Sequence, residues 1–221
     1  MASTMDDTGV LQTLLHFDRL SIDIPDIQGP LSAATACENV EAVQILLEHG
    51  EDVNEDNSEV CMGRTPLQAA VETGNLVLID LFLKKRADIN APAVPKRGAT
   101  ALQLAVITGR LGIARTLVDL GADINAPGAD HYGRTTLEGV AEHGRLDTVQ
   151  YLLSEGASTT GRWRLQYLRA IRYAELNGFM VVANLLRSHR EWTEYDVYIW
   201  ADLEELGVRD CEYYEDTNSE E

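Results

Sequence analysis

The stretch GRTPLQAAVETGNLVLIDLFLKKRADIN, at residues 63–90, decides the fold of this chain. Thr65 is a favourable N-cap residue, and Pro66 suits the first position of a helix, where its missing N–H costs nothing. Gln68, three residues after the threonine, completes a capping box. Gly74 supplies the left-handed residue that commonly ends a helix. Together these signals predict a pair of short helices with a hairpin after it.

The same order of residues recurs along the chain, which indicates a repeat architecture. The anchoring residues Leu31, Leu67, Leu102 and Leu137 stand 36, 35 and 35 residues apart, and a shorter fifth copy covers residues 170–189. Neither helix of a copy can bury its apolar side alone, so stacked copies must form the core. We therefore predict an all-α solenoid of about five helix-turn-helix repeats, joined by β-hairpin fingers and preceded by an N-terminal half repeat.

The repeated elements G-x-T-P-L, an alanine-rich first helix with a terminal glycine, L-L and G-A-D-x-N resemble the ankyrin repeat family over residues 11–190. The sequence GRTTLEGVAEHGR, followed by a divergent last copy, looks like ankyrin proteins of filamentous fungi. Glu38 and Arg86 depart from the family pattern, because each stands where a helix should end in glycine. The fifth copy lacks the G-x-T-P opening, which suits a terminal cap.

The predicted domain plan follows from these copies. It consists of an N-terminal cap (1–28), repeats (29–62, 63–97, 98–132, 133–162 and 163–190), a capping helix (191–207) and an acidic tail (208–221). The capping helix is predicted from side chains at helical spacing, namely Trp192, Tyr195, Ile199, Leu203 and Leu206. It either covers repeat five or forms an acidic, aromatic segment that another protein recognises.

The composition excludes several classes of function. The 221 residues contain 18 Lys and Arg against 36 Asp and Glu, and this net charge of −18 argues against a nucleic-acid or anionic-membrane surface. No apolar run exceeds five residues, whereas a membrane span needs about 20. The opening MASTMDDTGV has no basic residue, so we expect no secretory signal. Cys37, Cys61 and Cys211 form no C-x-x-C pair, which predicts reduced thiols and a cytoplasmic or nuclear location.

The strongest candidate for catalysis is the cluster of Glu138, Glu142 and His143 in the fourth copy. The two glutamates share a helix face, and a neighbouring histidine can act as a base. Glu138 is, however, the capping-box residue, and the other two directly precede a helix-ending glycine. The five histidines lie in different repeats without metal-ligand spacing, so we predict no metal, no cofactor and no enzymatic activity. The alternatives are a groove enzyme near repeats three and four, or a structural spacer.

The resemblance to ankyrin repeats implies a concave surface that binds a protein partner, made of the fingers (54–63, 90–98 and 125–133) and the ends of the first helices. The residues on that surface are Cys61, Met62, Arg64, Glu72, Thr73, Lys96, Arg97, Ile107, Thr108, His131, Tyr132, Arg134, Glu142 and His143. Four of them are Arg or Lys, and Arg is enriched in binding hot spots. Alternatively, Arg64 and Arg134 pack along neighbouring hairpins. We expect a monomer that binds an unidentified protein, either alone or as the C-terminal part of a larger signalling or regulatory protein.

Overall fold

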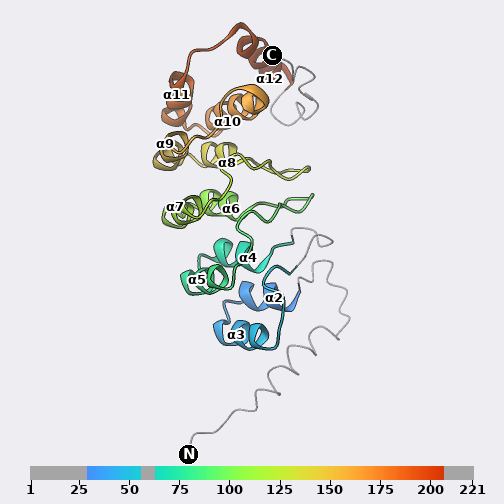
Figure 1. Ribbon diagram of the computed structural model, residues 1–221. Helices are drawn as coiled ribbons and strands as arrows, with labels where there is room; N and C mark the ends of the chain where they lie inside the picture. The colour runs from blue at the N-terminus through green and yellow to red at the C-terminus, as the bar shows by residue number, and fades with distance from the viewer. Residues whose placement is uncertain (1–28, 56–62, 207–221) are drawn as a thin grey trace, which may run out of the picture. The chain divides into compact units, whose positions relative to one another are not determined.

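The computed structural model describes residues 29–55 and 63–206, and within these ranges the chain is helical (Figure 1). The elements are α2 (Pro30–Ala36), α3 (Val40–Glu48), α4 (Pro66–Thr73), α5 (Leu76–Lys84), α6 (Ala101–Ile107), α7 (Leu111–Asp119), α8 (Thr136–Glu142), α9 (Leu146–Ser154), the 3₁₀ turn η1 (Gly161–Trp163), α10 (Arg164–Leu176), α11 (Met180–His189) and α12 (Glu194–Leu206). No β-strand occurs in the described ranges, so the fingers seen there are turns and not regular β-hairpins. The predicted half repeat, the acidic tail, Cys61 and Met62 lie outside the described residues.

The chain forms two compact units. Unit 1 contains the residues through Ala122 together with Gly128–Gly133, and unit 2 contains Asp123–Pro127 together with the residues from Arg134 onward. Helices α2 to α7 therefore belong to unit 1, and helices α8 to α12 belong to unit 2. Each unit has its own helix pairs and its own buried side chains.

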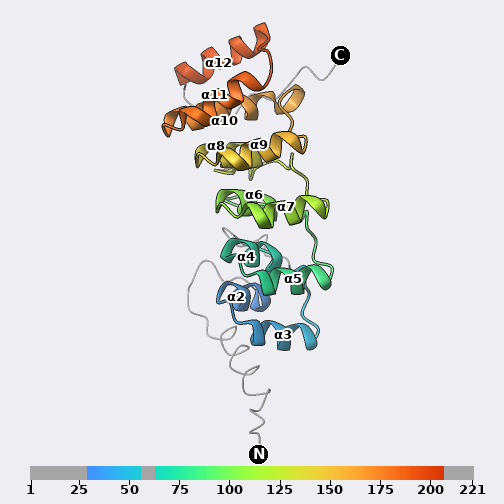
Figure 2. The same cartoon turned by 90° about the vertical axis from the view of Figure 1, so that its left-hand side faces the viewer.

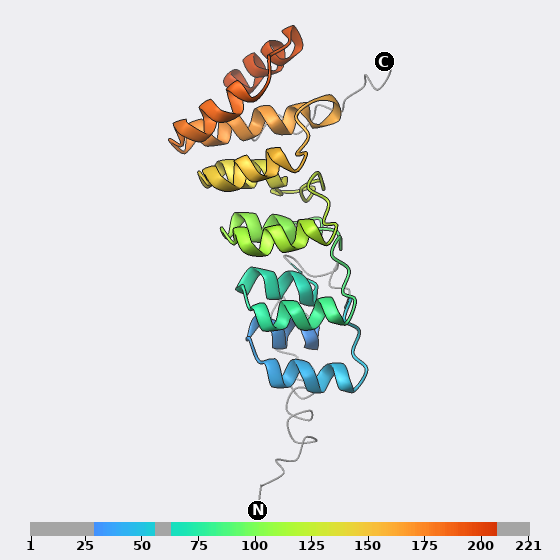
Figure 3. The same ribbon diagram turned by 60° about the vertical axis from the view of Figure 1, so that its left-hand side comes forward.

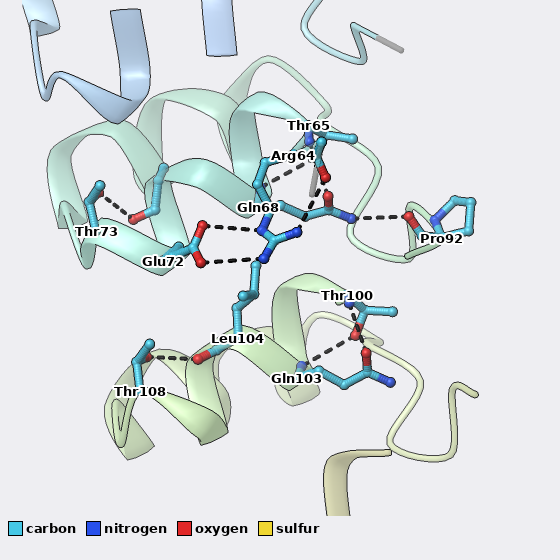
Figure 4. A network of polar contacts seen from close by, with 12 residues as sticks. Arg64, Thr65, Gln68, Glu72, Thr73, Pro92, Thr100, Gln103, Leu104 and Thr108 are labelled. Atoms are coloured by element: carbon cyan, nitrogen blue, oxygen red, sulfur yellow. Dashed lines mark hydrogen bonds and ion pairs between the residues drawn. The ribbon is translucent and has the colours of Figure 1, made fainter. Parts of the chain in front are cut away.

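The predicted helix starts and ends are confirmed. In each capping box, the threonine hydroxyl accepts a hydrogen bond from the N–H three residues later. The side chain at that later position accepts one from the threonine N–H (Figure 4). The three boxes are Thr65/Gln68, Thr100/Gln103 and Thr135/Glu138. The glycines that follow the first helices have φ between 66° and 80°, and they are Gly74, Gly109, Gly144 and Gly178. Local capping therefore sets the length of each short helix.

Unit 1 is a stack of three helix pairs, α2/α3, α4/α5 and α6/α7 (Figures 1 and 3). Helix α4 packs against both α2 and α6, so the first helices of the pairs form one layer and the second helices form the other. The anchoring residues Leu31, Leu67 and Leu102 are at most 1% exposed, and Phe82 and Leu117 of the second helices are 0% exposed. The residues that define the repeat in the sequence thus make the core of the stack.

Two helix ends in unit 1 use a left-handed residue that is not glycine. Glu38 has φ 55° and Arg86 has φ 65°, so both keep the backbone geometry for which the repeat elsewhere uses glycine. Such a conformation costs a residue with a side chain roughly 1–2 kcal/mol. The Glu38 carboxylate accepts a hydrogen bond of 3.2 Å from the Asn75 side chain, which ties the first helix pair to the second.

Unit 2 stacks α8/α9 on α10/α11, and α12 packs against α10 (Figure 2). Helix α10 has 13 residues where α8 has 7, and η1 stands in place of the missing G-x-T-P opening. Ile171, in the position of the anchoring leucine, is 0% exposed. Glu138 stands where α4 and α6 carry glutamine, and it is 2% exposed with Arg169 Nε of α10 at 3.0 Å. The acidic capping residue therefore occurs where the next repeat supplies an arginine.

The buried face of α12 differs from the predicted one. Trp192 precedes the helix, Tyr195 is 41% exposed, and the side chain of Leu206 lies outside the described residues. The buried residues are Asp196, Ile199, Trp200 and Leu203, none of them more than 8% exposed. The sequence prediction counted only apolar side chains and was wrong at the first turn, because an acidic residue occupies the buried position there.

Asp196 is buried because donors surround its carboxylate. Arg190 donates two hydrogen bonds of 2.7 Å, and the N–H and hydroxyl of Thr193 donate at 2.7 and 2.8 Å. The Nε of Arg164 lies 3.3 Å away. Burial by itself raises the pKa of Asp196, but the hydrogen bonds from Arg190 and Thr193 outweigh it and hold the pKa well below its usual range. This charged cluster joins α12 to the start of α10 and to the residue after α11.

The Arg190 guanidinium also covers an aromatic ring. It lies 4.8 Å from the ring centroid of Tyr167, whose hydroxyl donates a hydrogen bond to the Leu186 carbonyl oxygen. Burial raises the pKa of Tyr167 to about 12, although the nearby Arg190 charge opposes that shift. The tyrosine therefore stays neutral and serves as a buried hydrogen-bond donor inside unit 2.

Candidate functional site

Two finger tips of unit 1 are joined through their backbones. The N–H of Arg97 donates to the His131 carbonyl oxygen at 3.0 Å, and the N–H of His131 donates to the Pro95 carbonyl oxygen at 2.9 Å. The turn of the first of these fingers is tight, because a Cβ at Gly98 would lie 2.2 Å from the Val94 carbonyl oxygen. The loop between α5 and α6 extends beyond the helices in Figure 1. We call residues 95–97 and 131–132 the paired tips.

The backbone at the paired tips is strained at two exposed side chains. Arg97 has φ 57° and Tyr132 has φ 63°, in the left-handed region that few residues other than glycine adopt. Tyr132 is 66% exposed, and the Arg97 guanidinium lies 5.5 Å from its ring centroid, within cation–π distance. Strained residues that keep a side chain cluster at functional sites. The paired tips therefore qualify as a candidate site on geometry.

The paired tips also carry two cations that have no ion-pair partner among the described residues. Lys96 and Arg97 are exposed, and neither forms an ion pair with any carboxylate in the described ranges. Seven other arginines do lie against a carboxylate: Arg64, Arg134, Arg164, Arg169, Arg172, Arg187 and Arg190. In a chain with a net charge of −18, these two cations at the paired tips therefore have no carboxylate partner among residues 29–55 and 63–206.

Arg64 and Arg134 do not extend from finger tips as we expected. Arg64 is 5% exposed, because its guanidinium donates to both carboxylate oxygens of Glu72 at 3.1 and 3.4 Å (Figure 4). In unit 2, Arg134 donates to both oxygens of Glu142 at 2.9 and 3.4 Å and covers the ring of Tyr173 at 4.3 Å. Each arginine is thus packed against a glutamate of its own first helix, and Arg134 also against α10, whereas the alternative interpretation placed them along neighbouring hairpins.

The same two positions of the third copy hold an apolar pair. Arg64 and Glu72 stand eight residues apart, and Ala99 and Ile107 have the same spacing. Ala99 is 7% exposed, and Ile107 is half-buried at the end of α6. An ion pair and an apolar pair therefore replace each other at one structural position, which indicates packing as the role of this pair.

The threonines at the ends of α4 and α6 close their own helices. The hydroxyl of Thr73 donates to the Ala70 carbonyl oxygen at 3.1 Å, and that of Thr108 donates to the Leu104 carbonyl oxygen at 2.7 Å (Figure 4). The carbonyl oxygen of Thr73 also accepts a hydrogen bond of 2.5 Å from Arg110. These contacts explain both threonines by helix termination, whereas the paired tips have no comparable structural demand for their side chains.

The cluster considered for catalysis lies in unit 2, and its members have internal partners. Glu138 is held by Thr135 and by Arg169, and Glu142 belongs to the ion pair with the arginine described above. The Nδ1 of His143 lies 2.9 Å from the Gly139 carbonyl oxygen. These contacts do not arrange the three side chains as a nucleophile and its base.

Sequence reasoning missed an exposed apolar patch at the turn between α10 and α11. Its residues are Leu176 (60% exposed), Phe179 (38%), Met180 (51%) and Val181 (66%). Phe179 lies over Gly144, where a Cβ would meet the ring at 2.3 Å. The sequence LNGFMVV carries the signal, because it places large apolar residues on both sides of the helix-ending glycine. The periodicity alone did not distinguish these residues from the core.

Each unit has a hollow on its described surface. The one in unit 1, of about 450 Å³, is lined by Gln68 and Pro92 among others, and the one in unit 2, of about 410 Å³, by Arg162, Trp163 and Arg164 among others. Arg164 is already paired with a carboxylate, so its charge serves the packing of α12. The described ranges contain no cluster of three metal-ligating side chains. Nor does any helix within them have the length and apolar character to cross a membrane.

Each unit is a stack of short helix pairs, which is the all-helical arrangement of a repeat protein. A family model described as ankyrin repeats (3 copies) matches residues 1–93 and 92–162, which together exceed half of the chain. The chain therefore belongs to the ankyrin repeat family. Proteins of this family are generally protein–protein interaction modules and are typically non-catalytic. No curated protein sequence matches the chain.

Proposed function

We propose that this chain is a non-catalytic module that binds a protein partner at the paired tips of unit 1. The observation that carries the proposal is the combination of strain and exposure at Arg97 and Tyr132, whose side chains no packing contact requires. A purely structural turn would favour glycine at both positions. Retention of an arginine and a tyrosine there, two residue types enriched in hot spots, supports a binding role.

The rigidity of the paired tips supports the same proposal. The backbone bonds between the two fingers hold Lys96 and His131 side by side before any partner arrives. A partner then loses less free energy in ordering the loops, which is the usual advantage of a pre-organised surface. We further propose that the module acts as a monomer in the cytoplasm or nucleus, in keeping with cysteines that form no C-x-x-C pair.

Charge reversal at the paired tips tests the proposal. We expect Lys96→Glu combined with Arg97→Glu to abolish retention of the partner from an extract of the source cells by the immobilised chain. The free energy of unfolding should change by less than about 0.5 kcal/mol, because exposed tip residues contribute little to the core. Retention is measured by quantitative mass spectrometry, and folding is followed by circular dichroism.

The matched control is Lys84→Glu combined with Lys85→Glu, which changes the net charge equally on the exposed end of α5. It should retain the partner at the level of the unmodified chain. If both double variants retained as much partner as the unmodified chain, that result would contradict a binding role for the paired tips. Equal loss from both would mean that net charge, and not this surface, governs retention.

A further inference from the structure

We propose that the partner presents an acidic segment to the paired tips, with carboxylates that contact Lys96, Arg97 and His131 and an apolar or aromatic side chain that lies on Tyr132. This inference rests on the proposed function and adds the chemistry of the partner to it. It follows from the two cations of the paired tips, which are unpaired among the described residues, from the acidic character of the rest of the chain and from the exposed ring of Tyr132.

Most cations of the described ranges that lie near a carboxylate are paired with it, and seven arginines form such ion pairs. Lys96 and Arg97 are exposed and form no ion pair within these ranges, and the fold holds them beside each other and beside His131. The finger also carries Asp130, which forms no ion pair with either cation. An acidic segment supplies the missing carboxylates, and contact with exposed Lys and Arg requires little desolvation of either partner.

The acidic remainder of the chain sharpens this preference. Because the net charge is −18, an acidic segment is repelled by the chain as a whole and attracted only where cations gather, as they do at the paired tips. Like-charge repulsion at wrong positions is a common source of specificity and register. A basic partner would find acidic residues over the whole chain and would have no reason to select these two fingers.

The exposed aromatic ring adds a second requirement. Tyr132 is 66% exposed, and the Arg97 guanidinium lies 5.5 Å from its ring centroid. Aromatic and apolar side chains contribute most of the energy at binding hot spots. An acidic segment that alternates with aromatic residues therefore fits the paired tips better than a purely acidic one.

The test uses the full chain and a defined probe, a fluorescein-labelled peptide of twelve residues in which glutamate and tyrosine alternate. Fluorescence anisotropy at low salt should report saturable binding that weakens as salt is added. Lys96→Glu with Arg97→Glu should weaken binding at least tenfold. The control Lys84→Glu with Lys85→Glu should change it less than twofold. A peptide with glutamine in place of every glutamate should bind at least tenfold more weakly than the acidic one.

Three results would overturn the inference: equal affinity for the glutamate and glutamine peptides, equal affinity of the unmodified chain and the tip variant, or no saturable binding. The proposed function is judged separately. If the partner captured from extract is lost from the tip variant but the acidic peptide does not compete with it, the partner is not acidic and the binding role stands. If capture is insensitive to the tip variant as well, both proposals fail.

Discussion

Asp196→Asn is expected to lower the free energy of unfolding of unit 2 by about 3–5 kcal/mol, because it removes the buried charge that pairs with two half-buried arginines. Asp196 is 0% exposed and accepts two hydrogen bonds of 2.7 Å from Arg190, with Arg164 3.3 Å away. The neutral amide cannot compensate these charges. We expect α12 to lose its contact with α10 first, since this cluster lies where the two helices meet.

The contribution of Asp196 should depend on pH in a defined direction. Its pKa in the folded protein lies below the ordinary value of 3.8, so the stabilisation is complete above about pH 4. It is lost as the pH falls from there toward the lower pKa of the folded state, because the unfolded chain then binds a proton at this carboxylate that the folded protein does not. The difference in stability between the unmodified chain and Asp196→Asn should therefore shrink below about pH 4.

Urea unfolding followed by tryptophan fluorescence measures this effect, since Trp200 is buried on α12 and meets Trp192 edge-on, with the ring centroids 5.4 Å apart. The control is Glu204→Gln, which removes an exposed acid from the same helix. It should change stability by less than about 0.5 kcal/mol. A similar midpoint for Asp196→Asn and the unmodified chain would show that the buried cluster does not hold α12.

Leu117→Ala is expected to cost unit 1 about 2–5 kcal/mol, because it leaves a cavity in the core between stacked pairs. Leu117 lies on α7 and is 0% exposed. In a repeat stack, stability is a sum over repeats and their interfaces, so a cavity in one helix pair weakens the neighbouring interface as well. The measurement is the denaturation midpoint in urea, with far-ultraviolet circular dichroism as the signal.

Leu120→Ala provides a matched control for this prediction. The same leucine-to-alanine change follows α7 directly at a position that is 51% exposed. It should shift stability by less than about 0.5 kcal/mol. Equal midpoints for the two variants would contradict an account in which packing between repeats carries the stability.

The helix pairs were predictable because their signals are local. Thr65 and Gln68 are three residues apart, and the capping box they form depends on little else. The glycines that end the first helices could be predicted in the same way. Glu38 and Arg86, which replace such glycines, also have the left-handed backbone that the repeat pattern predicts. The buried cluster around Asp196 was not predictable, because it joins residues from three helical segments that meet only after the repeats have stacked.

The residues of the candidate site were likewise predictable only in part. Lys96, Arg97, His131 and Tyr132 were named because the resemblance to ankyrin repeats implies a binding surface on the fingers, and all four are exposed in the structure. Arg64 was misjudged, because its burial depends on Glu72 one helix length further along the chain. The signal that could have revealed it is the Arg–Glu spacing of eight residues in two copies and its replacement by Ala99 and Ile107 in the third.

The most direct test of the binding account is the double variant Arg97→Gly with Tyr132→Gly, examined for binding and stability together. Glycine at these two positions removes the conformational cost of a left-handed residue with a side chain, which is roughly 1–2 kcal/mol for each. Loss of the exposed cation–π contact costs about 0.5–1 kcal/mol. The account predicts that the variant is at least as stable in urea as the unmodified chain and retains less than a tenth of the partner captured from extract. Full retention of the partner by an equally stable variant would contradict it.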